Sequence, residues 1–157
     1  MNKKEEIRQS LDLKYYKFQL YLLMIIYGAM AGFMFILFAL NGLLGTGLVI
    51  AGILLLLYSP FLFYYLYRYF RVLRHPDAFE FYEAVLNEPH LSFYYRTNYF
   101  TVTFVDNSGR TVRADTKAIF GPGRVPLLPF FDDYFNQKVL IAYNSESEEV
   151  IVIKKIS

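Results

Sequence analysis

The sequence predicts a membrane α-helical hairpin followed by an all-β domain, and three observations support this fold class. The run from Phe18 to Tyr67 contains no Asp, Glu, Lys or Arg. As one helix it would be about 75 Å long at about 1.5 Å per residue, more than twice the hydrocarbon core of a bilayer, so it must fold back. The C-terminal part alternates apolar and polar residues and is rich in Tyr and Phe, which is typical of β-strands.

The break in the apolar run lies at Asn41–Gly47, which contains three glycines. It predicts two transmembrane helices, from Phe18 to about Leu40 and from about Leu44 to Tyr67. We expect the second helix to be kinked by its internal proline and to end at His75-Pro76. The predicted division is an interfacial or cytoplasmic N-terminal segment (residues 1–17), the hairpin (18–75) and a cytoplasmic β domain (76–157).

Charge is distributed unevenly along the chain. Residues 1–17 carry five Lys/Arg against three acids, and three arginines follow the second helix, so the flanks of the hairpin sum to +5. From His75 to Ser157 there are eight Lys/Arg and eleven acids, which gives −3. The positive-inside tendency then predicts a multi-pass membrane protein with both termini in the cytoplasm. Lys3–Lys17 is expected to be an interfacial helix or a frayed tail.

Small residues recur on both predicted helices, where they let two backbones approach closely. They indicate packing within the hairpin or, as the alternative, contact with a second copy or with a partner's helix. Because no ionisable residue lies inside the hydrocarbon, the hairpin is expected to be an anchor and not a transport pathway. The predicted helix-packing residues are Gly28, Gly32, Gly45, Gly52 and Ser59.

The β domain is predicted to be a small five-stranded OB/SH3-like barrel. Its most regular feature is an alternating strand at Tyr99–Val105, the turn Asp106–Gly109 and a return strand from Arg110 to Phe120. Glu80–Glu88 is predicted to be the first strand, although a helical face fits residues 78–88 as well, and Asn87–His90 is expected to be a turn. The other predicted strands are Lys138–Tyr143 and Val150–Ile156.

The sequence offers no recognisable catalytic constellation. There is no cysteine, and the two histidines, His75 and His90, belong to no motif. We therefore predict no enzymatic activity, no cofactor and no metal site. Tyr94–Arg96 and Tyr99 are suited to stacking on bases, but the charge of −3 argues against nucleic acid as a partner.

Val125–Phe131 contains no polar side chain and is expected either to close the barrel or to enter the membrane or a partner. Arginines near it and after the second helix are suited to anionic lipid headgroups, at about 1 kcal/mol each. The predicted interface residues are Arg68, Arg71, Arg74, Arg124, Leu127, Leu128 and Phe130.

The segments Tyr82–Leu86, Tyr99–Asp106 with Gly109, and Asn136–Tyr143 with Glu149–Ile153 resemble bacterial membrane proteins that carry a small β domain after one or two helices. They are distantly similar to NfeD-like barrels. The resemblance implies a non-enzymatic barrel of the oligonucleotide-binding type that works with membrane protein partners. With this resemblance we expect an adaptor or accessory subunit of the bacterial inner (cytoplasmic) membrane that contacts membrane lipid and a membrane protein partner or a second copy. The alternative is a lipid-headgroup-binding protein or enzyme at the cytoplasmic interface.

Overall fold

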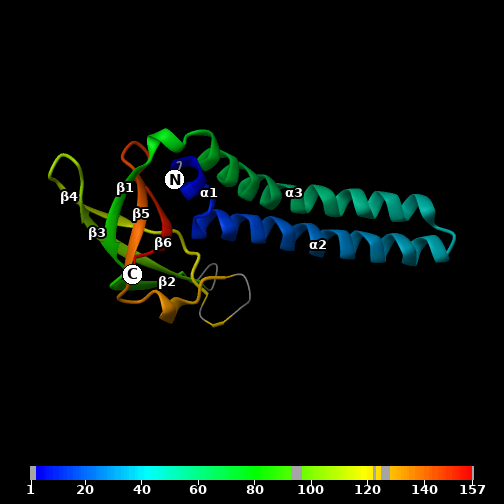
Figure 1. The fold of residues 1–157 in the computed structure, drawn as a ribbon. Helices are drawn as coiled ribbons and strands as arrows, with labels where there is room; N and C mark the ends of the chain where they lie inside the picture. Colours follow the sequence, from blue (N-terminus) through cyan, green and yellow to red (C-terminus); the bar gives the residue numbers. More distant parts are fainter. Residues whose placement is uncertain (1–2, 93–96, 122, 125–127, 157) are drawn as a thin grey trace. The chain divides into compact units, whose positions relative to one another are not determined.

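The computed structural model describes residues 3–92, 97–121, 123–124 and 128–156 (Figure 1). The chain divides into two compact units, Tyr16–Phe70 and Met1–Tyr15 with Arg71–Ser157, and each is described by itself. The helices are α1 (Lys3–Arg8), α2 (Leu11–Leu40) and α3 (Leu44–Arg74), with short 3₁₀ turns η1 (Pro76–Ala78) and η2 (Phe131–Asp133). The strands are β1 (Glu80–Val85), β2 (Glu88–Ser92), β3 (Thr97–Val105), β4 (Thr111–Asp115), β5 (Lys138–Asn144) and β6 (Glu149–Lys155).

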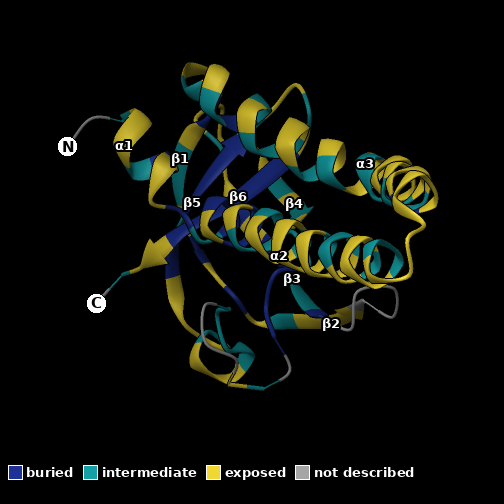
Figure 2. Ribbon diagram, turned by 90° about the vertical axis from the view of Figure 1, so that its right-hand side faces the viewer, coloured by how far each residue is buried: buried dark blue, intermediate teal, exposed yellow. Residues whose placement is uncertain are grey.

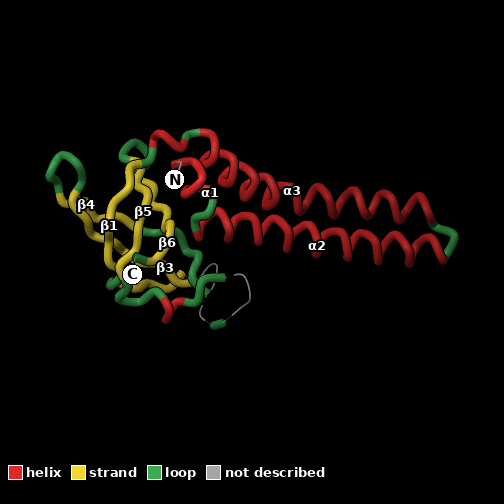
Figure 3. The backbone as a smooth tube through the Cα atoms, viewed as in Figure 1, coloured by secondary structure: helices red, strands yellow, loops and turns green. Residues whose placement is uncertain are grey.

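The first unit is the predicted helical hairpin. By length and composition, α2 and α3 can each cross a membrane, and Figure 3 shows them running side by side. The break falls where the sequence indicated. Gly42 has φ +72°, and the amides of Gly42 and Leu43 donate to the carbonyls of Ala39 (3.1 Å) and Phe38 (2.9 Å). This is a Schellman motif, in which a glycine in the left-handed region satisfies the last carbonyls of a helix.

Tyrosine side chains join the two helices within the hairpin. The hydroxyl of Tyr27 donates to the carbonyl of Ala51 (3.3 Å), and that of Tyr58 donates to Sδ of Met30 (3.4 Å). The rings of Tyr27 and Tyr58 lie 6.2 Å apart. Pro60 lies inside α3, and the hydroxyl of Ser59 beside it donates to the carbonyl of Leu56 (3.0 Å). Hydrogen bonds of this kind hold helices together where lipid supplies no hydrophobic drive.

Four of the predicted helix-packing residues do not lie at the contact between α2 and α3, and their alternative role in contact with a second copy or a partner's helix stays a prediction. No atom lies within 4 Å of the position that a Cβ would take at Gly28, Gly32, Gly45 or Gly52. The glycine at the contact is Gly47, where a Cβ would lie 3.1 Å from Cβ of Phe38. The sequence pattern therefore identified small residues correctly but could not assign them to a face, because helix rotation depends on the neighbouring side chains.

Gly47→Leu is expected to destabilise the hairpin by about 1–3 kcal/mol, because its side chain would be driven into Phe38. Gly52→Leu is the matched control, since a side chain there enters open space and gains the same helix propensity. Unfolding of both variants in mixed detergent micelles measures the difference. Equal stability of the two variants would show that Gly47 is not a close contact.

The second unit contains two three-stranded antiparallel sheets, with strand orders β1-β5-β6 and β2-β3-β4. The expected single five-stranded barrel is not formed, because the described strands pair into two separate open sheets. Residues 80–85 form the strand β1, so the strand prediction is correct for these residues and the helical alternative is not. The predicted turn at Asn87–His90 is wrong, because β2 begins at Glu88 and runs through Pro89. Proline is tolerated there because β2 is an edge strand.

The predicted hairpin of β3 and β4 is present, and its turn is held by Asp106. The carboxylate of Asp106 accepts hydrogen bonds from the amides of Ser108 and Arg110 (2.9 Å each), and Gly109 has φ +79°. The pKa of Asp106 is lowered by the hydrogen bonds that it accepts from Ser108, and the bond from the Ser108 hydroxyl has the largest effect. The return strand ends earlier than expected, at Asp115, because the hydroxyl of Thr116 accepts the hydrogen bond of the Phe100 amide (2.9 Å).

The core of this unit consists of buried side chains from β5, β6 and the inner part of β3, and Figure 2 draws buried residues in dark blue. Phe100 is fully buried, and its ring lies 4.9 Å from those of Phe120 and Phe131. Leu128 lies close to Gly121, where a Cβ would come within 3.7 Å of Cβ of Leu128. The described end of the predicted apolar loop therefore packs on the sheet unit.

The N-terminal segment belongs to the sheet unit as far as Tyr15. Ser10 caps α2, because its hydroxyl accepts a hydrogen bond from the amide of Leu13 (3.3 Å). Ile7 and Leu13 are buried, and Glu6 pairs with Lys154 of β6 (3.2 Å). The segment is therefore helical over Lys3–Arg8 and has buried apolar side chains, which a frayed tail would not have, and its place at the membrane interface stays a prediction.

Candidate functional site

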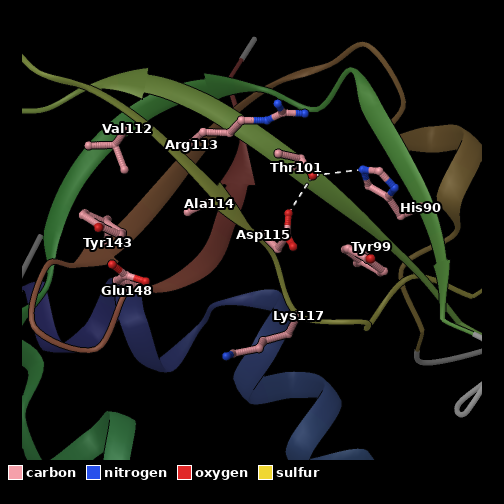
Figure 4. Close-up of a pocket in the computed structure, with 10 residues that line it drawn as sticks. All are labelled: His90, Tyr99, Thr101, Val112, Arg113, Ala114, Asp115, Lys117, Tyr143 and Glu148. Atoms are coloured by element: carbon pink, nitrogen blue, oxygen red, sulfur yellow. Dashed lines mark hydrogen bonds between the residues drawn. The ribbon is translucent and has the colours of Figure 1, made fainter.

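A cavity of the sheet unit with a volume of about 690 Å³ lies beside β4 (Figure 4). Its lining includes the consecutive residues Val112, Arg113, Ala114 and Asp115. Consecutive residues of a strand point to opposite faces of a sheet. A cavity lined by all four therefore runs along the edge of β4. Its other lining residues are His90, Tyr99, Thr101, Lys117, Tyr143 and Glu148.

Three side chains on β2, β3 and β4 form a hydrogen-bonded chain at one end of this cavity. The hydroxyl of Thr101 donates to Oδ1 of Asp115 (2.6 Å) and lies 3.0 Å from Nε2 of His90, as the dashed lines in Figure 4 show. Sheet register brings them together, because Thr101 lies opposite Asp115, and His90 lies opposite Tyr99, two residues from Thr101. The His90 ring also stacks on Tyr99 at 5.0 Å.

This chain of groups resembles a catalytic triad in composition but not in direction. A hydroxyl has one proton, and Thr101 gives its proton to Asp115. Nε2 of His90 must then carry a proton and donate it to Thr101, so the imidazole nitrogen facing the hydroxyl cannot act as its base. Thr101 is also only 6% exposed. The arrangement fixes three strands and orients two ring systems, and it does not activate a nucleophile.

The charges of the cavity are only partly neutralised. Arg113 forms an ion pair with Glu88, and Lys117 forms one with Glu149 (3.6 Å), so both cations are paired with carboxylates outside the lining. Within the described part of the chain, no Lys or Arg forms an ion pair with Asp115 or Glu148. The cavity therefore presents two uncompensated carboxylates.

A second group of charges lies buried behind Lys117. The side chain of Glu149 is only 4% exposed and pairs with both Lys117 and Arg71 (3.9 Å). Asp12, which precedes the charge-free run, is fully buried, and its Oδ2 accepts a hydrogen bond from the amide of Val152 (2.8 Å). Among the described residues its Oδ1 has no hydrogen-bond partner. Burial raises the pKa of Asp12 to about 7, opposed by the Val152 amide and by Lys117.

A smaller cavity of about 390 Å³ adjoins Glu149 on the side of Arg71 and His75. Its other lining residues are Ala78, Phe79, Asn144, Glu146 and Ser147. Over the described ranges, no three His, Asp or Glu side chains are grouped so that they could hold a metal ion.

Arginines that were predicted to bind headgroups contact other protein groups within their own units. Arg71 is paired with Glu149 as described, and Arg124 is paired with Asp133 (3.8 Å) and lies over the ring of Phe130 (5.4 Å). In the hairpin unit Arg68 lies over the ring of Tyr64 (5.6 Å). Arg74 ends α3, and Leu128 packs near Gly121. Leu127 and Tyr94–Arg96 lie outside the described residues.

Comparison with family models, curated proteins and solved structures found no match. The similarity to NfeD-like barrels therefore stays an expectation, and the function must be argued from the cavity itself.

The polar residues of the site were missed from sequence for two different reasons. Thr101 and Asp115 are cross-strand neighbours of the predicted hairpin, so counting outward from its turn would have found them. Asp12 gives no such signal, because its hydrogen-bond partner Val152 is 140 residues away. In the sequence Asp12 is one of several charged residues in the polar segment 1–17, and nothing distinguishes it from the others.

Proposed function

We propose that this chain is a non-enzymatic adaptor or accessory subunit, anchored in the bacterial inner membrane, that presents its sheet domain to a membrane protein partner. The observation that carries the proposal is the open cavity along β4, which is built for contact and not for chemistry. The hydroxyl of Thr101 in this cavity is buried and donates to the carboxylate of Asp115. The carboxylates of Asp115 and Glu148 in its lining are uncompensated. Such a surface suits a binding module.

The hairpin supports the anchoring part of this proposal. Both long helices are apolar enough to span a bilayer, and the run from Phe18 to Tyr67 is free of charged residues. Without an Asp, Glu, Lys or Arg in this run, the hairpin offers no charged relay for ions or protons. With flanks of +5, the positive-inside tendency favours cytoplasmic termini.

The alternative of a headgroup-binding protein or enzyme is less well supported. It depends on arginines that are free to meet phosphate, but Arg71 and Arg124 are already paired with Glu149 and Asp133. Releasing either arginine would leave its carboxylate partner without that ion pair. The arrangement thus favours a protein partner over lipid.

Cross-linking in native membranes tests the adaptor proposal. We expect a photo-reactive residue at Thr111, at the start of β4, to capture one defined membrane protein. The same residue at Phe135, exposed elsewhere on the sheet unit, should not. Capture of lipid alone at Thr111, or of the same proteins at both positions, would contradict the proposal.

Reporter fusions test the topology. A reporter that is active only in the cytoplasm is expected to be active at both termini and inactive when inserted after Gly42, in the loop between the helices. Activity in the loop and not at the termini would place the sheet domain outside the cytoplasm and overturn this part of the proposal.

A further inference from the structure

We propose that an extended segment of the partner protein adds as a strand to the outer edge of β4 and places a Lys or Arg side chain between Asp115 and Glu148. This inference rests on the proposed adaptor function and names the surface and the chemistry of the partner. Three features of the sheet unit support it: free backbone groups, uncompensated charge and a cavity at the same edge.

The free backbone groups follow from the register of β3 and β4. The amide of Thr116 donates to the carbonyl of Phe100 (2.8 Å), and that of Asp106 donates to the carbonyl of Arg110 (2.9 Å). In an antiparallel ladder hydrogen-bonded pairs alternate with non-bonded pairs, so Val112 and Ala114 are the residues bonded to β3 between them. The backbone groups of Thr111, Arg113 and Asp115 therefore point away from the sheet.

No strand pairs with this outer edge in the described part of the chain, since β4 is the last strand of its sheet. An exposed strand edge is a template for pairing with another chain. The outer edge of β6 differs, because one of its amides, that of Val152, already donates a hydrogen bond to the carboxylate of Asp12. The chain thus covers the edge of β6 with its own side chain and leaves the edge of β4 without a paired strand beside the cavity of about 690 Å³.

Charge selects a basic side chain in the added strand. Asp115 lines the cavity from β4, and Glu148 lines it from the turn between β5 and β6 (Figure 4). The cations of the lining, Arg113 and Lys117, are already paired. Tyr143 and Val112 in the same lining offer apolar surface for the methylene stem of a Lys or Arg.

The same charges disfavour a second copy of this chain at the edge. In a symmetric antiparallel pairing of two β4 strands centred on Arg113, the middle residue, the two Arg113 side chains would lie directly opposite each other. Like charges in directly opposed positions are destabilising. The observations therefore favour a different polypeptide.

A peptide selection on the full chain tests the inference. The protein, reconstituted in lipid nanodiscs, is used to select from a displayed library of random ten-residue peptides, and the enriched peptides are measured by fluorescence anisotropy. We expect alternating β-forming residues with one Lys or Arg. We also expect bound peptide to slow amide exchange at Thr111, Arg113 and Asp115 by tenfold or more, while Val112 and Ala114 are protected already.

Two pairs of variants separate the backbone contribution from the charge contribution. Arg113→Pro removes an outward N–H without removing a bond to β3, and it should weaken binding at least tenfold. Arg113→Ala loses the same ion pair but keeps the N–H and should bind within threefold of the wild type. Glu148→Gln should weaken binding about fivefold. Glu146→Gln, in the same turn but outside this cavity, should not.

Several results would overturn the inference: no enriched peptide, enriched acidic peptides, or unchanged binding by Arg113→Pro. Concentration-dependent protection of the outward amides in the free protein would assign the edge to a second copy and overturn it too. If Arg113→Pro does not fold, the amide exchange of the wild type decides. Capture of a membrane protein at Thr111 that survives Arg113→Pro would leave the adaptor proposal standing and reject strand addition alone.

Discussion

Asp12→Asn is expected to remove most of the loss of stability that the wild type shows as pH rises from about 4 to 7. The pKa of this carboxyl is about 7 in the folded protein, against 3.8 in its ordinary state. The folded state therefore binds more protons than the unfolded state between these values, and the free energy of unfolding falls with rising pH. Above pH 7 the loss is complete, at about 4 kcal/mol as an upper limit.

The surroundings of Asp12 explain why its pKa is raised. Burial disfavours the charged form, and the nearby carboxylate of Glu149 acts in the same direction, while the Val152 amide and Lys117 oppose both. Asparagine keeps an oxygen to accept the hydrogen bond of Val152 but carries no charge. The variant is therefore expected to be the more stable protein at pH 8.

Thermal unfolding of the detergent-solubilised full chain at several pH values provides the measurement. Asp77→Asn is the control, because it removes one carboxylate from the same unit at an exposed position. If Asp77→Asn flattened the profile as much as Asp12→Asn, or if wild-type stability rose over this pH range, Asp12 would not be the titrating group.

Phe100→Ala is expected to destabilise the sheet unit by about 3–5 kcal/mol, because it empties a fully buried position between two aromatic rings. The loss should also free the segment that begins at Leu128, since Phe131 stacks on Phe100. Denaturant unfolding in detergent gives the stability, and limited proteolysis reports on the segment.

Phe135→Ala is the matched control for this prediction. Phe135 follows η2 and is 40% exposed, so its removal should cost about 1 kcal/mol or less. A similar loss for both variants would contradict the proposed core position of Phe100. Unchanged proteolysis of the Leu128 segment in Phe100→Ala would show that another contact holds it.

Local pattern was sufficient for the membrane hairpin and for one β-hairpin. The charge-free run and Asn41-Gly42 predicted α2 and α3 and the break between them, because helix length and glycine conformation are local properties. The turn at Asp106–Gly109 was equally clear, since its side-chain hydrogen bonds join residues at most four apart. The strand β2 was missed because Pro89 suggests a turn, and only its place at a sheet edge makes it acceptable.

By itself the sequence determined that the chain has two long apolar helices joined as a hairpin and a separate β domain. The tertiary structure decided that the edge of β4 carries no paired strand, that no described Lys or Arg pairs with Asp115 or Glu148 of the cavity, and that Asp12 accepts a hydrogen bond from Val152 in the middle of β6. It also showed that Gly47, and not the regularly spaced glycines, lies where the two helices meet. The physical reason is the range of the interactions. Turns and helix ends depend on neighbours in sequence, whereas pairing, burial and charge compensation depend on residues that only folding brings together.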